Sequence, residues 1–141
     1  MISDDIRNDL VRAVSMLERA GIIDFNGHCS IRLGADALAI NSGRSVRSAL
    51  KPEDIVAIDS DGALIEGEDV PPLEFPIHAE LYRRRPDVAA VVHAHPAYST
   101  LFTMAGRAIE PVFPHGAVLV GADIREAFAL AIYLEDNAKS Q

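Results

Sequence analysis

Residues 88–96 read VAAVVHAHP, an apolar run that ends in two histidines and a proline. The run predicts a buried strand over residues 88–95, which Pro96 terminates. Side chains two positions apart on a strand point to the same face, so His93 and His95 are expected to aim at one point. Two neutral imidazoles side by side suit a divalent metal such as Zn²⁺, but a catalytic site also needs a third ligand and an open position.

Helical patterns flank this strand on both sides. Residues 97–105 favour a helix up to Gly106. Upstream, a helix is expected over residues 74–85, with Glu74 at its start, where the helix dipole favours an ionised carboxylate. The expected buried stripe of that upstream helix is Ile77, Leu81 and Tyr82.

The rest of the chain continues the alternation of strands and helices. An amphipathic helix is expected between Ser3, its N-cap, and Gly21, its stop. Asp123 and Glu126 predict a capping box at the start of the last helix. Short apolar runs predict strands at residues 37–40, 55–58, 63–65 and 117–120, with a hairpin turn at 59–62. The pattern indicates an α/β sandwich with a mixed or largely antiparallel sheet.

Composition limits the classes of function. The chain has 141 residues, 49% of them hydrophobic, and a formal charge of −8, so we expect one globular domain over residues 1–141. An acidic chain repels phosphate backbones and anionic lipids, which argues against nucleic acid and membrane partners. Cys29 has no second cysteine to pair with, and the N-terminus lacks a signal-peptide pattern. A cytoplasmic enzyme or binding module is therefore expected.

The third metal ligand must come from outside the His-x-His pair. His115 is one candidate, because it precedes a predicted strand that a neighbour could reach; His78 lies one turn after Glu74 and could share its helix face. A His-x-His pair alone is a weak signal, since most histidines are simply hydrogen-bonded residues. Glu74 is either a base beside a metal or a favourable charge in a first helical turn.

Several segments together resemble the class II aldolase/adducin family. The central block is LEFPIH at 73–78 followed by RPDVAAVVHAH at 85–95. GHCSIR at 27–32 resembles the G-N-x-S-x-R block of the family, and NSG at 41–43 resembles its T-P-T-G-like loop. HGAVLVG at 115–121 resembles its late N-H-G-x-x-x-x-G element. The similarity covers nearly the whole chain.

The resemblance implies a fold, an assembly and a metal site. The implied fold is a three-layer α/β/α sandwich around a mostly antiparallel mixed sheet, and the implied assembly is a homotetramer with active sites at subunit interfaces. His93, His95 and His115 would be the metal ligands and Glu74 the acid/base, while His78 matches a position of mainly supporting role. Zn²⁺ is the expected metal, although three imidazoles would also accept Mn²⁺, Co²⁺ or Fe²⁺.

The resemblance also implies a set of substrate-binding residues, although some of them differ from the family pattern. Sugar-phosphate aldolases of the family hold phosphate with the Asn of G-N-x-S and two serines before the glutamate, but this chain has His28, Pro72 and Leu73 there. Two nearby guanidinium groups suit a carboxylate as well as a phosphate, or are solvated surface charges. The implied substrate-binding residues are His28, Ser30, Ser42, Gly43, Arg44 and Arg47.

These features together predict a divalent-metal-dependent carbon–carbon lyase that works through a metal-stabilised enolate. The G-H-x-S block with its Arg/Ser-rich loop resembles the family branch that contains decarboxylases, and this resemblance implies decarboxylation of a hydroxy- or oxo-carboxylate, with an aromatic acid as one option. The alternatives are an aldolase acting on a hydroxy-oxo acid or a sugar phosphate, and a non-catalytic adducin-like interaction domain. Only residues 107–114 separate the two family blocks, where the family normally has several tens of residues and a C-terminal helical tail follows. Two alternatives stay open: the chain is shortened there and at its C-terminus, or a stretch is absent from this sequence. No proton donor is assigned.

Overall fold

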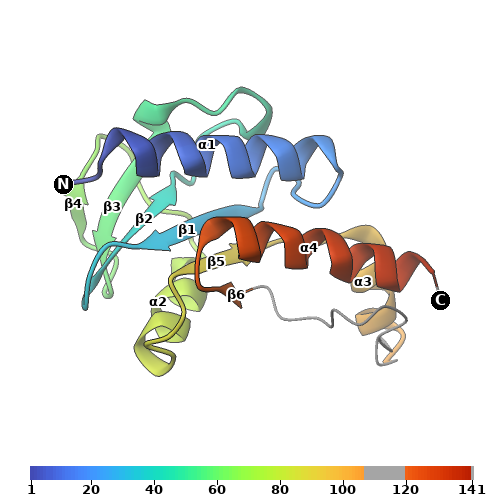
Figure 1. The fold of residues 1–141 in the computed structure, drawn as a ribbon. Helices are drawn as coiled ribbons and strands as arrows, with labels where there is room; N and C mark the ends of the chain where they lie inside the picture. Colours follow the sequence, from blue (N-terminus) through green and yellow to red (C-terminus); the bar gives the residue numbers. More distant parts are fainter. Residues whose placement is uncertain (107–119, 141) are drawn as a thin grey trace.

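The computed structural model describes residues 1–106 and 120–140 and has three layers (Figure 1). Its central layer is a six-stranded sheet of order β4-β3-β2-β1-β5-β6. Every pairing between the described strands is antiparallel, so the predicted α/β sandwich is confirmed without a parallel pair among them. The strands are β1 His28–Arg32, β2 Ala37–Asn41, β3 Ile55–Asp59, β4 Leu64–Glu66, β5 Ala90–His93 and β6 Val120–Gly121.

Helices cover both faces of the sheet. Figure 1 shows α1 and α4 along one face and α2 on the other, with α3 beside α4. None of the described helices is long and apolar enough to cross a membrane. The helices are α1 Asp4–Arg19, α2 Phe75–Arg84, α3 Ala97–Met104 and α4 Ile124–Lys139, with short 3₁₀ turns at Arg47–Ala49 and Pro52–Asp54.

Side chains at the predicted helix starts satisfy free backbone N–H groups. Ser3 Oγ accepts from the N–H of Ile6, which confirms it as the N-cap of α1. The Asp123 carboxylate accepts from the first turn of α4, as the predicted capping box requires. Glu126, however, accepts from the N–H of Ala122 and not from that of the N-cap residue. Its carboxylate thus ties the chain leaving β6 to the start of α4.

The strands alternate between two separate cores. Ala39 of β2 packs with α1 and α4, whereas its neighbours Leu38 and Ile40 pack with α2. β3 and β5 alternate in the same way, so both faces of the sheet are buried. A strand buried on both faces appears in the sequence as a continuous apolar run, and this explains why the runs at residues 37–40 and 55–58 predicted strands correctly.

The face toward α2 differs from the expectation in two respects. The predicted stripe of α2 is partly wrong, because Ile77 is 40% exposed, whereas His78, Ala79 and Tyr82 are buried. The reason is β1, a strand the apolar runs did not predict, whose residues on this face are polar and accept a polar partner. β5 also ends at His93, so His95 lies beyond the strand. Of the strand predicted at 117–120, residues 117–119 lie outside the described residues.

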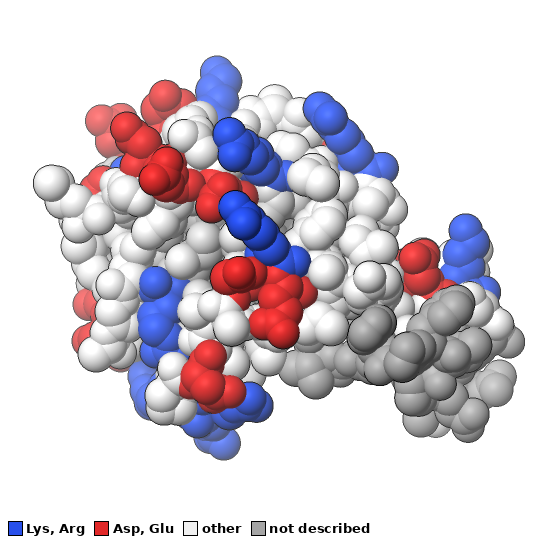
Figure 2. Space-filling view, in the orientation of Figure 1, with Lys and Arg blue, Asp and Glu red and all other residues white. Residues whose placement is uncertain are grey.

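Charges are mixed over the surface in view. In Figure 2, Lys and Arg side chains alternate with Asp and Glu on this face, and the described residues form no continuous basic surface there. Several large apolar side chains are exposed instead, including Phe25 at 80% and Leu73 at 97%. Both line the cavity described below.

Candidate active site

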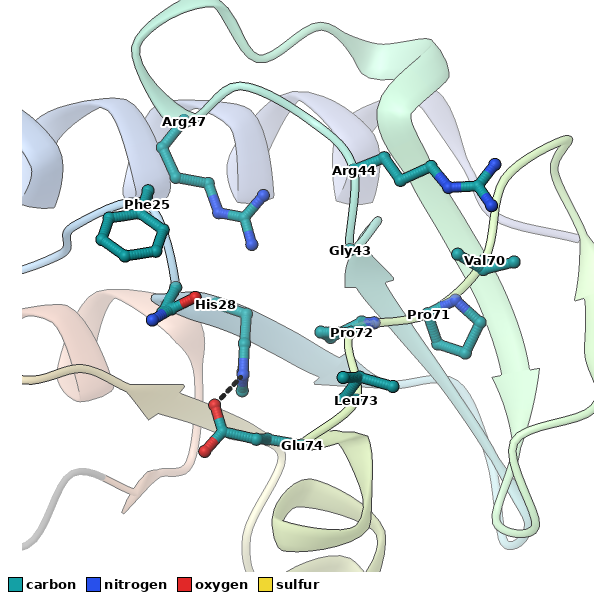
Figure 3. A pocket seen from close by; sticks show the side chains of 11 residues that line it. Phe25, His28, Gly43, Arg44, Arg47, Val70, Pro71, Pro72, Leu73 and Glu74 are labelled. Atoms are coloured by element: carbon teal, nitrogen blue, oxygen red, sulfur yellow. Dashed lines mark ion pairs between the residues drawn. The ribbon is translucent and has the colours of Figure 1, made fainter.

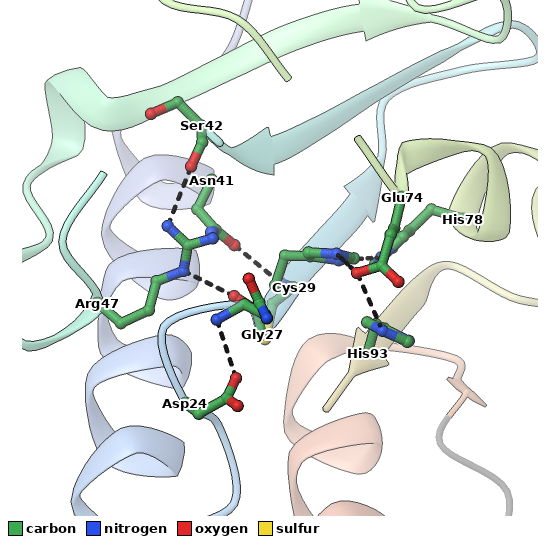
Figure 4. Close-up of polar contacts among 11 residues, drawn as sticks. Asp24, Gly27, Cys29, Asn41, Ser42, Arg47, Glu74, His78 and His93 are labelled. Carbon is green, nitrogen blue, oxygen red and sulfur yellow. Dashed lines mark hydrogen bonds and ion pairs between the residues drawn. The ribbon is translucent and has the colours of Figure 1, made fainter. Parts of the chain in front are cut away.

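Strand pairing brings two histidines together on the face of the sheet toward α2. β1 and β5 are antiparallel, with His28 opposite His93, and the two rings stack with centroids 4.8 Å apart. Glu74 occupies the N-cap position of α2 but makes no side-chain cap bond. Its Oε2 instead lies 3.5 Å from Nε2 of His28 and 3.4 Å from Nε2 of His93 (Figure 4). One carboxylate oxygen is therefore shared by two imidazoles.

Burial keeps both imidazoles uncharged. It lowers the pKa of His28 to about 4, helped by the neighbouring His93 and opposed by the Glu74 carboxylate. Burial likewise lowers the pKa of His93, again against the Glu74 carboxylate. The contacts to Glu74 are thus between a carboxylate and neutral rings at neutral pH, and they are not full ion pairs.

The donor set fits a divalent metal ion. Nε2 of His28 and of His93 are buried and have no hydrogen-bond partner among residues 1–106 and 120–140. These two nitrogens and a Glu74 oxygen all lie within 4.8 Å of one another. Imidazole nitrogen and carboxylate oxygen are ligands that Zn²⁺ and similar metals accept. A buried imidazole nitrogen without a hydrogen-bond partner can offer its lone pair to a metal ion, and the carboxylate beside it can complete the coordination.

The other predicted metal ligands are placed differently. The His95 ring lies edge-on to that of His93, with centroids 4.8 Å apart, and is exposed. It is not one of the three residues whose ligand atoms converge. His115 lies outside the described residues. The assignment of His93, His95 and His115 as a ligand set remains a prediction.

A chain of buried hydrogen bonds runs behind His28. Nδ1 of His28 lies 2.7 Å from Nε2 of His78, and Nδ1 of His78 lies 2.6 Å from Oγ of Ser30. Oγ of Ser30 is in turn 2.7 Å from the hydroxyl of Tyr82. His28, Ser30 and His78 are 0% exposed and Tyr82 is 6% exposed. The sequence predicted Ser30 as a substrate contact and Tyr82 as an apolar core residue, whereas the structure places both in this chain.

A cavity of about 540 Å³ adjoins the Glu74 carboxylate (Figure 3). Predicted substrate-binding residues His28, Gly43, Arg44 and Arg47 line it together with Glu74. The apolar part of its lining is Phe25, Val70, Pro71, Pro72 and Leu73. The cavity therefore offers an apolar wall, a carboxylate and guanidinium groups in one space.

The two arginines of the cavity are held differently. Arg47 is 5% exposed; its Nε donates to the Gly27 carbonyl at 2.7 Å and its Nη1 to the carbonyls of Ser42 and Ser45. Its Nη2 has no hydrogen-bond partner within the described part of the chain. Arg44, by contrast, has a side chain 78% exposed and lies 3.7 Å from Asp69. Arg47 is thus a cation held in a fixed position at the cavity wall, with the Asp24 carboxylate as a nearby opposite charge.

Three further residues have structural positions. Ser42 is buried and supplies the carbonyl that Arg47 binds. Gly43 packs so closely on the next loop that a Cβ would lie 3.0 Å from the carbonyl oxygen of Pro71. Cys29 is fully buried toward α1, and burial raises the pKa of its thiol to about 12. A thiol in that state is not a nucleophile.

Comparison with known proteins places this geometry in a family. The model of the class II aldolase and adducin N-terminal domain matches residues 8–114. A 3,4-dihydroxyphthalate decarboxylase from Arthrobacter keyseri is 35% identical over 115 residues, which cover 75% of this chain and 46% of the relative. An L-fuculose phosphate aldolase from Methanocaldococcus jannaschii is 30% identical over 88% of this chain and 68% of the relative.

Solved structures support the same fold. An L-fuculose 1-phosphate aldolase from Glaciozyma antarctica superposes with a TM-score of 0.85 at 20% identity, covering 96% of this chain and 71% of that one. The chain covers 46% of the length of the Arthrobacter keyseri decarboxylase, so it spans about half of that relative. On the match over residues 8–114 and the shared fold, the chain belongs to the class II aldolase and adducin family.

Proposed function

We propose that this chain is a divalent-metal-dependent carbon–carbon lyase acting on a small carboxylate substrate. The observation that carries the proposal is the Glu74 carboxylate, which lies between two orphaned imidazole nitrogens at the wall of a cavity. The guanidinium of Arg47 also lines this cavity. A metal centre and an anion-binding group in one space suit the cleavage of a bond next to a carboxylate.

The proposed metal ligands are His93, His95 and His115, of which His115 lies outside the described residues. The Glu74 carboxylate lies beside His93 and can approach the same ion. Zn²⁺ is the proposed ion, since imidazole-rich sites accept it readily. A divalent metal bound there supplies a Lewis acid that polarises a substrate carbonyl. Glu74 is half-exposed, with 46% of its side chain accessible, so it can reach both the metal site and a molecule in the cavity.

Glu74 is also the proposed acid/base. Its Oε2 takes a proton from a substrate hydroxyl or returns one to the carbon that loses its bonding partner. The residue occupies the N-cap position of α2 without a side-chain cap bond, so its carboxylate is not used to cap the helix. No second proton donor is assigned within the described residues.

Arg47 is the proposed partner of the substrate carboxylate. Its Nε and Nη1 are used to fix it in place, which leaves Nη2 available at the cavity. In decarboxylation the carbon–carbon bond to the carboxylate breaks, carbon dioxide leaves, and the electron pair passes to the carbonyl oxygen of the substrate. The name of the Arthrobacter keyseri relative favours an aromatic dicarboxylate as substrate.

Aldol cleavage is the second candidate, favoured by the fuculose phosphate aldolase relative. In that reaction Glu74 accepts the proton of a hydroxyl, and the bond between the hydroxyl carbon and its neighbouring carbon breaks. The hydroxyl carbon leaves as an aldehyde, and the electron pair of the broken bond passes to the carbonyl oxygen of the remaining fragment. Arg47 would then bind a phosphate, which a guanidinium also suits.

The exposed Phe25 and Leu73 beside the cavity support assembly into an oligomer, proposed as a tetramer, that covers them.

Metal content and product analysis test the proposal. We expect about one equivalent of metal per subunit by plasma mass spectrometry in wild-type protein, and its loss in His93→Ala. Glu74→Gln is expected to lower kcat by about 10²–10⁴-fold. Carbon dioxide without aldehyde indicates a decarboxylase, and an aldehyde indicates an aldolase. Wild-type protein that binds neither Zn²⁺ nor Mn²⁺ would leave the adducin-like interaction domain as the better reading.

A further inference from the structure

The position of one proton on His28 follows from the buried chain behind it. Each neutral imidazole carries one N–H, so the bond between His28 Nδ1 and His78 Nε2 contains a proton from only one of them. That choice also fixes whether His78 donates to Ser30 or accepts from it. The two histidines therefore have two arrangements, which run in opposite directions.

In the first arrangement the protons point toward the cavity. Tyr82 donates to Ser30, Ser30 donates to Nδ1 of His78, and Nε2 of His78 donates to Nδ1 of His28. Every member donates once, and the remaining proton of His28 sits on Nε2. That nitrogen faces Oε2 of Glu74 at 3.5 Å, where an N–H is favourable beside a carboxylate.

In the second arrangement the protons point away from the cavity. His28 then donates from Nδ1 to His78, and His78 donates to Ser30. The bond between Ser30 and Tyr82 can run either way, but the hydroxyl that accepts in it needs a further acceptor for its own proton. No hydrogen bond within the described residues supplies that acceptor. Burial also raises the pKa of Tyr82, so the phenol keeps that proton. At the other end, a lone pair of His28 faces the Glu74 carboxylate.

We propose that Ser30 and His78 are positioning residues that hold His28 as its Nε2–H tautomer. His28 is accordingly a hydrogen-bond donor to the cavity and not a metal ligand, although its nitrogen lies among the converging ligand atoms. The metal is left to Glu74 and His93, with His95 and His115 as the other proposed ligands. The donation from His28 to a substrate oxygen rests on the proposed function. The tautomer of His28 does not depend on that function.

The size of the bias follows from the unsatisfied groups. A buried hydroxyl without an acceptor disfavours the second arrangement by a factor of about ten or more. The bias depends on Ser30, since its hydroxyl is the group that donates to His78. It does not depend on the Tyr82 hydroxyl, because without it Ser30 still has His78 as its acceptor.

Nitrogen-15 NMR of the histidine side chains, on full-length protein without added metal, tests the tautomer directly. We expect wild-type His28 to be protonated at Nε2 and Tyr82→Phe to retain that tautomer. Ser30→Ala is expected to give a mixture of both tautomers, and the exposed Tyr98→Phe serves as the matched control without effect. Wild-type His28 protonated at Nδ1, or an unchanged tautomer in Ser30→Ala, overturns the proposal. If Ser30→Ala does not fold, the wild-type and Tyr82→Phe spectra still decide it.

Metal binding supplies an independent arm. With added Zn²⁺, His28→Gln is expected to change the dissociation constant less than threefold, whereas His93→Gln raises it at least tenfold. An equal loss of affinity in both variants would make His28 a ligand and overturn the donor assignment. If neither the wild-type protein nor any variant binds metal, the lyase proposal fails. The NMR spectra then still decide the tautomer of His28, because they need no metal.

Discussion

Arg47→Met is expected to lower the free energy of unfolding by about 2–4 kcal/mol. The guanidinium donates to carbonyls of Gly27, Ser42 and Ser45, and the first two of these residues are buried. Hydrogen bonds from a charged group contribute about 1.5–3 kcal/mol each, and their loss leaves buried acceptors without donors. Part of that loss is offset because burial disfavours the charge, as the lowered pKa of Arg47 indicates.

Urea denaturation measures this effect, with Arg44→Met as the matched control. Arg44 has a side chain 78% exposed and a single distant ion pair to Asp69, so its removal is expected to change stability by less than about 1 kcal/mol. Equal stability of the two variants would refute the account of Arg47 as a buried clamp on the loops around the cavity.

Arg47→Lys separates the clamp from substrate binding. Lysine keeps the charge, but its three N–H groups spread from one nitrogen and cannot reach the three carbonyls and a ligand as the wide, five-donor guanidinium does. Isothermal titration with phthalate as an aromatic dicarboxylate probe should show binding at least about tenfold weaker in Arg47→Lys than in wild type. Phthalate affinity that is unchanged in Arg47→Lys but lost in Arg44→Met would assign the carboxylate contact to Arg44.

Three further predictions concern stability. Glu135→Gln should lower the melting temperature and reduce stability by about 1–2 kcal/mol, because this carboxylate accepts from two backbone N–H groups at the start of α3; an unchanged melting temperature contradicts that role. Gly43→Ala should reduce stability by about 1–3 kcal/mol, since the added Cβ lies 3.0 Å from a backbone oxygen, and urea denaturation checks it. His28 has its pKa lowered from 6.5 to about 4, so the unfolded chain binds a proton that the folded chain does not. Stability is therefore retained above pH 6.5 and falls between 6.5 and about 4, by at most about 1.4 kcal/mol per pH unit. Denaturation curves of His28→Gln should show a weaker fall over that range.

The sequence predicted most of the fold because most strands are buried on both faces. Such strands appear as short apolar runs, and those at residues 37–40 and 55–58 match β2 and β3. β1 gave no such signal, since it presents His28 and Ser30 to one face and Cys29 to the other. The polar residues of β1 point inward and form the site. The same polar residues interrupt the apolar run by which a strand is predicted, so β1 was missed.

The site was predictable in its residue types but not in its pairings. His93 and Glu74 are close in the sequence, and their convergence was expected from a strand next to a helix start. The approach of His28 to His93 depends on pairing between segments about 65 residues apart in the chain, which no local pattern encodes. The role of Tyr82 was likewise hidden, because a tyrosine on an apolar helix stripe resembles any core residue.

The register of β1 against β5 links the fold to the chemistry. Opposite residues His28 and His93 share the face toward α2, where Glu74 begins the helix and His78 packs beneath it. Because side chains alternate along a strand, a shift of β1 by one residue would turn Cys29 toward α2 and remove the imidazole from Glu74. The apolar residues that alternate with the polar ones oppose such a shift, since Cys29 and Val92 are buried in the core under α1 and α4. The hydrophobic core on one face of the sheet therefore fixes the positions of the polar groups on the other.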